Sequence, residues 1–243
     1  MIETKSLSHT VRLFATSLCW TDLFKPVMYC SYHGDLKKIP FWYKKEKGHS
    51  CVTDLKLSLD ELLGKMKSNT RNEIRRAERE GCAFAVEDGV QNFIPFYNSF
   101  CDSKGFADQV SEARLGKFKH LLVTKSMKGE TVLAMHVTQL DPIGKTALLI
   151  LSGSQRLDAD ADQKLIGWGN RFLHYKDLEW LKAQGYEIYD WCGVCLDPND
   201  PRYSIGQFKL GLGGTVVESW TLRTPLYVFL ERAHDLVRKL RSK

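Results

Sequence analysis

The chain has 243 residues, 43% of them hydrophobic and 26% charged. This composition supports one large globular domain and leaves little room for a second independent core. No run of about 18 apolar residues is present, and no compact apolar run follows a basic cluster near residue 1, so we expect neither a transmembrane segment nor a signal peptide. The formal net charge of +6 suits an anionic partner, such as a nucleotide-linked substrate, coenzyme A, RNA or an anionic membrane surface. A mildly basic surface without a function would carry the same charge.

The seven cysteines are scattered along the chain and odd in number. Cys30 lies within the apolar run VMYCSY, where a reduced thiol behaves as a small hydrophobic side chain. This usage favours a reducing compartment over a disulfide framework. We therefore expect a cytoplasmic protein.

The first half of the chain is expected to contain strands and capped helices. Ser58 precedes Glu61 by three residues, the spacing of a capping box that begins a helix. The same spacing separates Thr70 from Glu73 and predicts a second helix, which should end at Gly81. The expected elements are a strand at 27–33, helices at 58–66 and from 70 to 81, a strand at 82–88 and a helix within 90–106.

The centre of the chain predicts three strands joined by the short turns MKG and PIG, which is the pattern of an antiparallel meander. The expected elements are strands at 120–126, 130–141 and 145–154, a helix at 162–184, a strand at 186–191, a loop at 192–203, a Gly-rich segment leading into a last strand, and a helix at 225–241. This order predicts a mixed α/β fold of the α+β type, with a mostly antiparallel sheet flanked by helices, in a single domain over residues 1–243.

Three segments together resemble a known family. Residues 67–81 follow the pattern K-x-x-x-R-x-x-I-R-x-A-x-x-x-G, and residues 182–193 give K-x-x-G followed by a strand that ends in Y-D-x-x-G. Residues 208–214 read F-K-L-G-L-G-G, similar to a family segment F-K-x-x-F-G-G, with Leu212 in place of the aromatic residue. The chain thus resembles, over 58–222, the Fem-type enzymes that attach amino acids to peptidoglycan precursors.

The resemblance implies a GNAT-like acyltransferase, in which an amine attacks an activated acyl group. Fem-type enzymes carry two such domains and take the acyl group from aminoacyl-tRNA, whereas this chain has room for one. Both acyl-CoA and aminoacyl-tRNA therefore stay open as donors, and no metal or permanently bound cofactor is expected. The implied acceptor is an amine of a cell-envelope precursor, such as a nucleotide-linked amino sugar or a peptidoglycan-like intermediate. Polysaccharide biosynthesis is the corresponding process.

The resemblance also implies candidate catalytic residues. Asp190 ends a strand beside a Gly-containing loop and would orient or deprotonate the acceptor amine; the alternative is an aspartate that caps the loop. Tyr203 would protonate the leaving group, or is a packed aromatic. Lys209, beside Phe208 in a Gly-rich turn, would neutralise an oxyanion or a donor phosphate, or is a solvated lysine. Phe208 itself is a candidate for substrate binding.

An arginine-rich helix is the candidate anion-binding site. Arg71, Arg75 and Arg79 lie four residues apart and share one helix face, with Arg76 beside them. Arginine forks match phosphate oxygens, so Arg71, Arg75 and Arg76 would bind a nucleotide sugar or a tRNA backbone. The alternative is a solvated face paired with neighbouring glutamates. These arginines also suggest an alternative function for the chain, as a non-catalytic module that binds RNA or phosphate.

The segment Gly153, Ser154, Gln155 and Arg156 occupies the place where GNAT enzymes hold the coenzyme A pyrophosphate at a helix start. No glycines follow, and three aspartates lie near the helix start. Their carboxylates would compete with phosphate for the helix amides. The sequence therefore predicts an absent or altered coenzyme A cradle.

Two further features are weighed against structural explanations. His136 lies among apolar residues of a central strand and is either a general base or a core residue. The sequence Trp191-Cys-Gly-Val-Cys195 resembles a thioredoxin site, but Pro198 and Pro201 prevent the helix that a redox cysteine begins. We expect no redox function. A zinc site would require a second ligand pair, which the sequence lacks.

Overall fold

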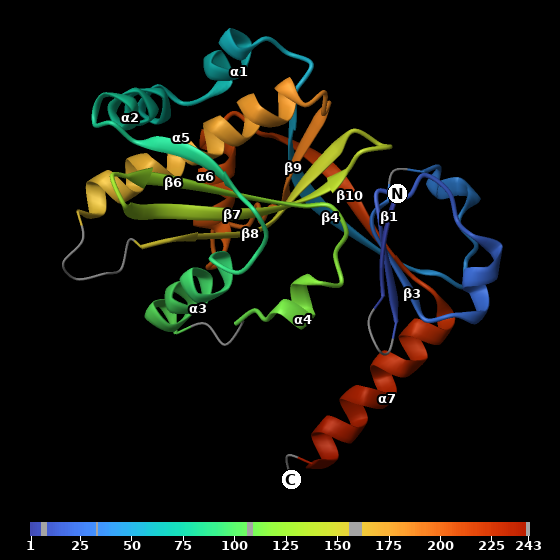
Figure 1. Cartoon of the computed structure of the whole chain (residues 1–243). Coiled ribbons are helices and arrows are strands. Elements are labelled where there is room, and N and C mark those ends of the chain that lie inside the picture. The colour runs from blue at the N-terminus through green and yellow to red at the C-terminus, as the bar shows by residue number, and fades with distance from the viewer. Residues whose placement is uncertain (6–8, 33, 106–108, 156–161, 242–243) are drawn as a thin grey trace. The chain divides into compact units, whose positions relative to one another are not determined.

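The computed structural model describes residues 1–5, 9–32, 34–105, 109–155 and 162–241. The chain divides into two compact units, unit 1 formed by 1–50 with 217–243, and unit 2 formed by 51–216 (Figure 1). Strands β4 (Lys44–Asp54) and β10 (Thr215–Arg223) each run from one unit into the other. The single domain expected from the sequence stays a prediction.

Unit 2 is built on a mixed sheet. Its strands are β5 (Ala83–Glu87), β6 (Leu121–Lys128), β7 (Thr131–Asp141), β8 (Thr146–Ser154) and β9 (Ile188–Gly193). They lie in the order β9-β8-β7-β6-β5, with all pairs antiparallel except β8 with β9. The antiparallel meander predicted from the sequence is confirmed, as is the mixed, mostly antiparallel fold class.

Helices cover both faces of this sheet. They are α1 (Leu59–Lys65), α2 (Ser68–Arg79), α3 (Phe93–Lys104), the short α4 (Glu112–Leu115), α5 (Gln163–Ala183) and α6 (Tyr203–Gly211). Figure 1 shows α2 and α5 on one side of the sheet and α3 on the other. One apolar core joins α2 and α5 to β9 through Ile74, Phe172 and Trp191, and a second joins α3 to β6 and β7 through Phe93 and Val137.

The helix starts test the capping predictions. The capping box of α1 is confirmed, because the Ser58 Oγ accepts from the Glu61 N–H at 3.3 Å and the Glu61 carboxylate accepts from the Ser58 N–H at 2.8 Å. The second box is wrong: α2 begins at Ser68, and Thr70 lies buried inside it. Glu73 instead forms an ion pair with Arg171 of α5 at 2.7 Å. The side chain that the local pattern assigned to a helix cap therefore makes a tertiary contact.

The segment before β10 also differs from prediction. Residues expected to form a loop followed by a Gly-rich turn include helix α6. At Gly206 an added Cβ would lie 2.8 Å from the Cys195 carbonyl oxygen and from Val194 Cγ2. Glycine is therefore needed here for close packing against residues 194–195, and it does not mark a turn. Gly213, at φ +86°, follows the helix end.

Unit 1 contains strands β1 (Ile2–Lys5), β2 (Thr10–Leu13) and β3 (Val27–Tyr32) with parts of β4 and β10, the 3₁₀ helices η1 (Trp20–Phe24) and η2 (Leu36–Lys38), and helix α7 (Pro225–Arg241). The strand expected at 27–33 is confirmed over Val27–Tyr32, and residue 33 lies outside the described residues.

The buried Asp22 carboxylate of unit 1 receives hydrogen bonds from Arg12 at 2.9 Å and from the Tyr29 hydroxyl at 2.6 Å. Helix α7 is confirmed, but much of its apolar stripe is exposed. Among the described residues, no helix combines the length and apolar character needed to cross a bilayer.

Candidate active site

Strand β9 carries a buried carboxylate at Asp190. The prediction that Asp190 ends the strand is wrong, because β9 continues to Gly193. The pairs between β8 and β9 run from Thr146↔Ile188 to Leu148↔Asp190, and both strands continue beyond the last pair. Asp190 is only 2% exposed, and its Oδ1 accepts a hydrogen bond from the Cys192 N–H at 2.8 Å. Cys192 has φ +71°, a conformation that costs energy for a non-glycine residue and is concentrated at functional sites. Asp190 therefore holds a strained strand end in place.

Lys209 is brought to the same strand end by α6. The sequence suggested that Lys209 lies in a Gly-rich turn. This prediction is wrong, because Lys209 lies within the helix. Its Nζ donates to the Gly193 carbonyl oxygen at 2.7 Å. Burial lowers the pKa of the Lys209 ammonium, whereas the nearby Cys192, Cys51 and Asp190 side chains oppose this shift. The structure thus brings Asp190 and Lys209 together across the end of β9.

Tyr203 is the first residue of α6, six positions before Lys209. In an α-helix this spacing places two side chains roughly 120° apart around the axis and about 9 Å apart along it. The two residues therefore do not share a helix face. A leaving-group role for Tyr203 stays a prediction.

Phe208 packs between α6 and α5. The Arg171 guanidinium lies over its ring at 5.3 Å from the centroid, and the His174 ring is 5.4 Å away in an edge-to-face arrangement. These contacts fix the side chain that precedes Lys209. Substrate binding by Phe208 stays a prediction, and its evident role is to anchor α6 on α5.

The arginines of α2 have different surroundings. Arg71 donates through Nη1 to the Met66 carbonyl, and to the Gly64 carbonyl at 3.4 Å, at the end of α1. The Arg76 guanidinium lies 4.5 Å over the Trp168 ring, and Arg75, Arg76 and Arg79 are all exposed. The structure thus gives Arg71 and Arg76 packing roles, and the phosphate clamp predicted from the sequence stays untested.

The candidate coenzyme segment follows β8. Gly153 is buried, and a Cβ placed there would contact the rings of Tyr97, Phe100 and Phe96 of α3 at 3.4–3.5 Å. Ser154 pairs with Ala134 of β7, and the Gln155 N–H donates to the Leu133 carbonyl at 3.2 Å. Arg156 lies outside the described residues. Gly153 therefore serves packing, and donor binding by the four residues stays a prediction.

The start of α5 is capped by a carboxylate. The Asp162 Oδ1 accepts from the N–H groups of Lys164 at 3.0 Å and Leu165 at 3.1 Å. These two amides belong to the helix start at which a pyrophosphate would be expected to bind. Asp162 therefore occupies two of the amides for which the sequence predicted competition, and an altered coenzyme A cradle stays a prediction.

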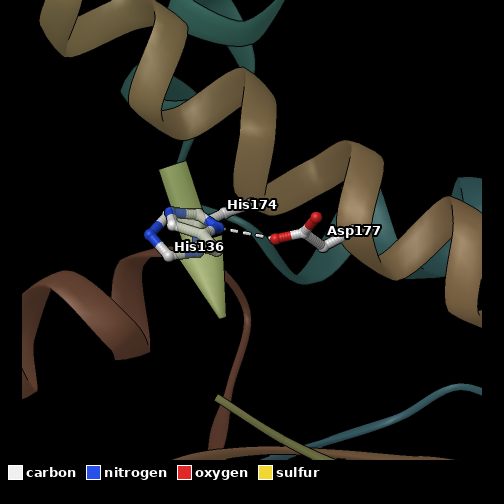
Figure 2. A group of neighbouring side chains, drawn as sticks. All are labelled: His136, His174 and Asp177. Carbon is white, nitrogen blue, oxygen red and sulfur yellow. Dashed lines mark hydrogen bonds and ion pairs between the residues drawn. The ribbon is translucent and has the colours of Figure 1, made fainter. Parts of the chain in front are cut away.

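A buried polar cluster lies between β7 and α5, as Figure 2 shows. His136, which is 0% exposed, contacts Asp177 Oδ2 through Nδ1 at 2.6 Å and Asn170 Oδ1 through Nε2 at 3.4 Å. The His174 ring lies 4.0 Å from the His136 ring. Burial, aided by His136, Arg171 and Lys209, holds the pKa of His174 well below its usual value, so it is neutral near pH 7.

These contacts make His136 a hydrogen-bonded core residue, the structural alternative considered for it. Sequence reasoning missed His174 and Asp177. Their only signal was a histidine and an aspartate three residues apart within an otherwise apolar helix stripe.

The cluster has the residue types of a metal site, since one ligand atom from each of His136, His174 and Asp177 lies within 4.8 Å of the others. The 2.6 Å contact between His136 and Asp177 is a hydrogen-bond length, shorter than the roughly 3.3 Å that separates two ligands on one tetrahedral zinc. The stacked imidazoles also have planes only 31° apart, so their in-plane lone pairs do not converge nearby. We interpret the group as a polar core cluster.

The cysteine pair does not lie at a helix start. Strand β9 continues through Cys192 to Gly193, and α6 begins only at Tyr203. Both thiols are free. The cysteine that begins a helix in thioredoxin-like sites therefore has no counterpart here, as the two prolines predicted.

Comparisons with known proteins place the fold. No family model matches the chain, and no curated protein matches its sequence. The structure of FemX matches with a TM-score of 0.64 at 11% identity, covering 90% of this chain and 82% of that one. The C-terminal domain of a protein described as a lysylphosphatidylglycerol synthetase from Agrobacterium fabrum matches with a TM-score of 0.62 at 14% identity, covering 96% and 84%.

L-PGS from Bacillus licheniformis matches with a TM-score of 0.61 at 16% identity, covering 98% of this chain and 85% of its own. At these identities the likeness lies in the fold and not in the sequence. It confirms the fold that the three sequence segments predicted. The chain therefore has a Fem-like fold, shared with FemX and with the two synthetase structures.

Proposed function

We propose that this protein is an N-acyltransferase whose site lies at the end of β9. The observation that carries the proposal is the convergence of Asp190 and Lys209 there, with the Lys209 Nζ 2.7 Å from the Gly193 carbonyl oxygen. The fold shared with FemX and the synthetase domain supports the same chemistry. Unit 2 supplies each of these residues.

Lys209 has the chemistry to stabilise the transition state. An ammonium has three N–H donors, so it can hold the Gly193 carbonyl and a substrate oxygen at the same time. When the amine attacks the acyl carbon, a C–N bond forms and negative charge develops on the acyl oxygen, which the ammonium stabilises. Collapse then breaks the bond to the departing oxygen or sulfur, which takes up the proton that the amine loses.

Asp190 acts in this proposal as a positioning residue. At 2% exposure it is too enclosed to meet an incoming amine directly. Its hydrogen bond to the Cys192 N–H fixes the backbone that presents the Gly193 carbonyl to Lys209. Its negative charge also favours the ammonium form of Lys209. We thus prefer the orienting role over deprotonation.

The start of α5 favours aminoacyl-tRNA as the donor. Asp162 occupies two amides of that helix start, and its carboxylate repels a second anion placed there. A coenzyme A pyrophosphate would have to displace it, whereas the ester at a tRNA 3′ end needs no pyrophosphate cradle. The acceptor that we propose is an amine on an anionic envelope precursor, either a nucleotide-linked amino sugar or a peptide stem, and the proposed location is the cytoplasm.

The rival function, a non-catalytic module that binds RNA or phosphate through α2, gains no support. Arg71 is bonded to the end of α1, and Arg76 lies on Trp168. These two arginines thus make contacts within the chain, although Arg75, Arg76 and Arg79 are exposed.

The test is a transfer assay with the purified chain and two labelled donor pools, aminoacyl-tRNA and acyl-CoA, each offered with nucleotide-linked amino sugars and peptidoglycan precursors. We expect label to move from tRNA to an amine acceptor. Transfer from acyl-CoA alone would overturn the donor assignment and keep the acyl-transfer proposal. Absence of transfer with both donors, combined with salt-sensitive RNA binding, would favour the binding module.

A further inference from the structure

The two units differ sharply in charge. Unit 1 contains 14 Lys and Arg residues against 7 Asp and Glu, a net charge of +7, whereas unit 2 contains 21 against 22, a net charge of −1. The basic character of the chain thus resides in the 77 residues of unit 1. An anionic partner of that unit is favoured by electrostatics, while unit 2 is close to neutral.

Unit 1 also carries the exposed aromatic residues. Among the residues that the structure describes, every exposed Trp or Phe belongs to it, with Phe41 at 90%, Trp20 at 85% and Phe229 at 66% exposure. The exposed large hydrophobic residues of unit 2 are aliphatic and separate in sequence, as at Ile143 and Ile205. Exposed aromatics concentrated on one unit mark a binding surface.

These side chains border two cavities that share residues. A groove of about 420 Å³ is lined by Phe41, Trp42 and Phe229, with the cations Lys44 and Arg232 at its wall. A neighbouring pocket of about 380 Å³ is lined by Trp20, Pro40 and again Trp42, with Lys38. We call Trp20, Phe41, Trp42 and Phe229 the aromatic surface. It is continuous through Trp42 and mixes aromatic rings with lysine and arginine.

Helix α7 extends this surface with aliphatic side chains. Leu236 follows Phe229 by seven residues, and Val237 follows Leu230 by seven, so each pair shares one helix face. All four side chains are exposed. Figure 1 shows α7 leaving β3 at its first turns and projecting away from the strands of unit 1. The helix therefore presents an apolar face that the described part of unit 1 does not cover.

We propose that the aromatic surface and α7 dock unit 1 on an anionic lipid bilayer. Tryptophan and phenylalanine with flanking lysine and arginine suit the boundary between headgroups and acyl chains, and a net charge of +7 is attracted to anionic headgroups. The inference does not depend on the proposed acyl transfer, which uses residues of unit 2.

Other occupants fit less well. A second copy of the chain would bring one +7 unit against another, which repel each other. RNA would suit the charge, and bases stack on aromatic rings. The aliphatic side chains of α7, however, provide no stacking platform, whereas they match the apolar layer of a bilayer.

The test is sedimentation of the full chain with vesicles of phosphatidylcholine, with and without phosphatidylglycerol. We expect binding only to vesicles that contain phosphatidylglycerol, and weaker binding in high salt. The double variant Phe41→Ser/Phe229→Ser should lower the partition coefficient by about tenfold or more, and Arg232→Gln by about fivefold. Ile143→Ser, which removes a 94% exposed apolar side chain from unit 2, is the matched control and should bind like the parent.

Circular dichroism and melting temperature establish that each variant is folded, and the substituted side chains are exposed. Equal binding by the double variant and the parent would overturn the proposal, as would absence of binding to both vesicle types. Binding of bulk tRNA that the same double variant abolishes, without vesicle binding, would assign the surface to nucleic acid. A concentration-dependent dimer that the double variant dissociates would assign it to a second copy.

Discussion

Two neighbouring residues with opposite charges define the proposed site. Asp190 fixes Cys192 at φ +71°, and Lys209 reaches the next carbonyl, that of Gly193. Both contacts end on the same short stretch of backbone. The effects of changing the two residues are therefore not expected to be additive, and their separate contributions require variants that change one property at a time.

Lys209→Ala should lower kcat by about 10²–10³ while the protein stays folded, because one stabiliser of the developing oxyanion is lost. Lys209→Arg should rescue only partly, since the wider fork does not fit a site shaped for an ammonium. Rates are measured at saturating donor, so that weaker binding is not mistaken for slower chemistry. Lys104→Ala, an exposed lysine on α3, is the control. Turnover of Lys209→Ala within a few-fold of the parent would remove this residue from the site.

The neutral His174 predicts a pH dependence of stability. Burial holds the pKa of His174 in the folded state well below the ordinary 6.5. Below pH 6.5 the imidazole therefore binds a proton in the unfolded chain but stays neutral in the folded chain. The free energy of unfolding should therefore fall as the pH drops from 6.5 toward the folded pKa, by up to about 1.4 kcal/mol per pH unit. Urea denaturation of the parent and His174→Gln measures this, and the variant should show the shallower slope. Equal slopes would contradict the assignment.

At the scale of elements, periodicity and turn signals predicted most strands and helices. The predictions of element type and boundary failed where a contact between residues distant in sequence determined the local structure. The start of α2 moved because Glu73 pairs with Arg171, and α6 was missed because Gly206 meets residues 194–195 closely. The cluster of His136, His174 and Asp177 forms only when β7 and α5 pack. None of these contacts leaves a local pattern.

Arg71 and Arg75 differ in their contacts. Arg71 is hydrogen-bonded to the end of α1, whereas Arg75 is exposed. Arg71→Ala should lower the free energy of unfolding by about 1–3 kcal/mol, because it removes a charged donor from the Met66 carbonyl. Arg75→Ala changes an exposed position of the same helix and should stay within about 0.5 kcal/mol. Chemical denaturation of both variants checks this. If Arg71→Ala leaves stability unchanged and weakens an anionic substrate, the phosphate clamp regains support.

Neither cysteine lies at a helix start, because α6 begins only at Tyr203, and this predicts that the thiols are dispensable. Cys192→Ser/Cys195→Ser should keep acyl transfer largely intact, because no helix start lowers a thiol pKa there. Cys192→Ser retains the backbone N–H that Asp190 binds. Transfer and insulin-reduction assays, run on the parent and the double variant, are the measurements. A disulfide-reductase activity of the parent that disappears in the double variant would overturn this interpretation.

At the scale of the whole molecule, the two proposals are assigned to different units. The acyl-transfer residues belong to unit 2, and the charged aromatic surface belongs to unit 1. The sequence indicated a basic protein with an anionic partner, but it did not show that the charge gathers in one unit. That unit is assembled from both ends of the chain, so neither end alone has the composition of the assembled surface.

This construction from both ends has a consequence for biosynthesis. The antiparallel partner of β3 is β10, which pairs Tyr32 with Trp220 and Met28 with Arg223. Residues 33–214, which include nearly all of unit 2, leave the ribosome between these two strands. Strand β3 therefore meets this partner only after nearly 190 further residues have been made, and pairings between residues so distant in sequence form slowly. A nascent chain arrested before β10 would present β3 with one edge unpaired, a template for aggregation, so we expect chaperones to bind the emerging N-terminal segment.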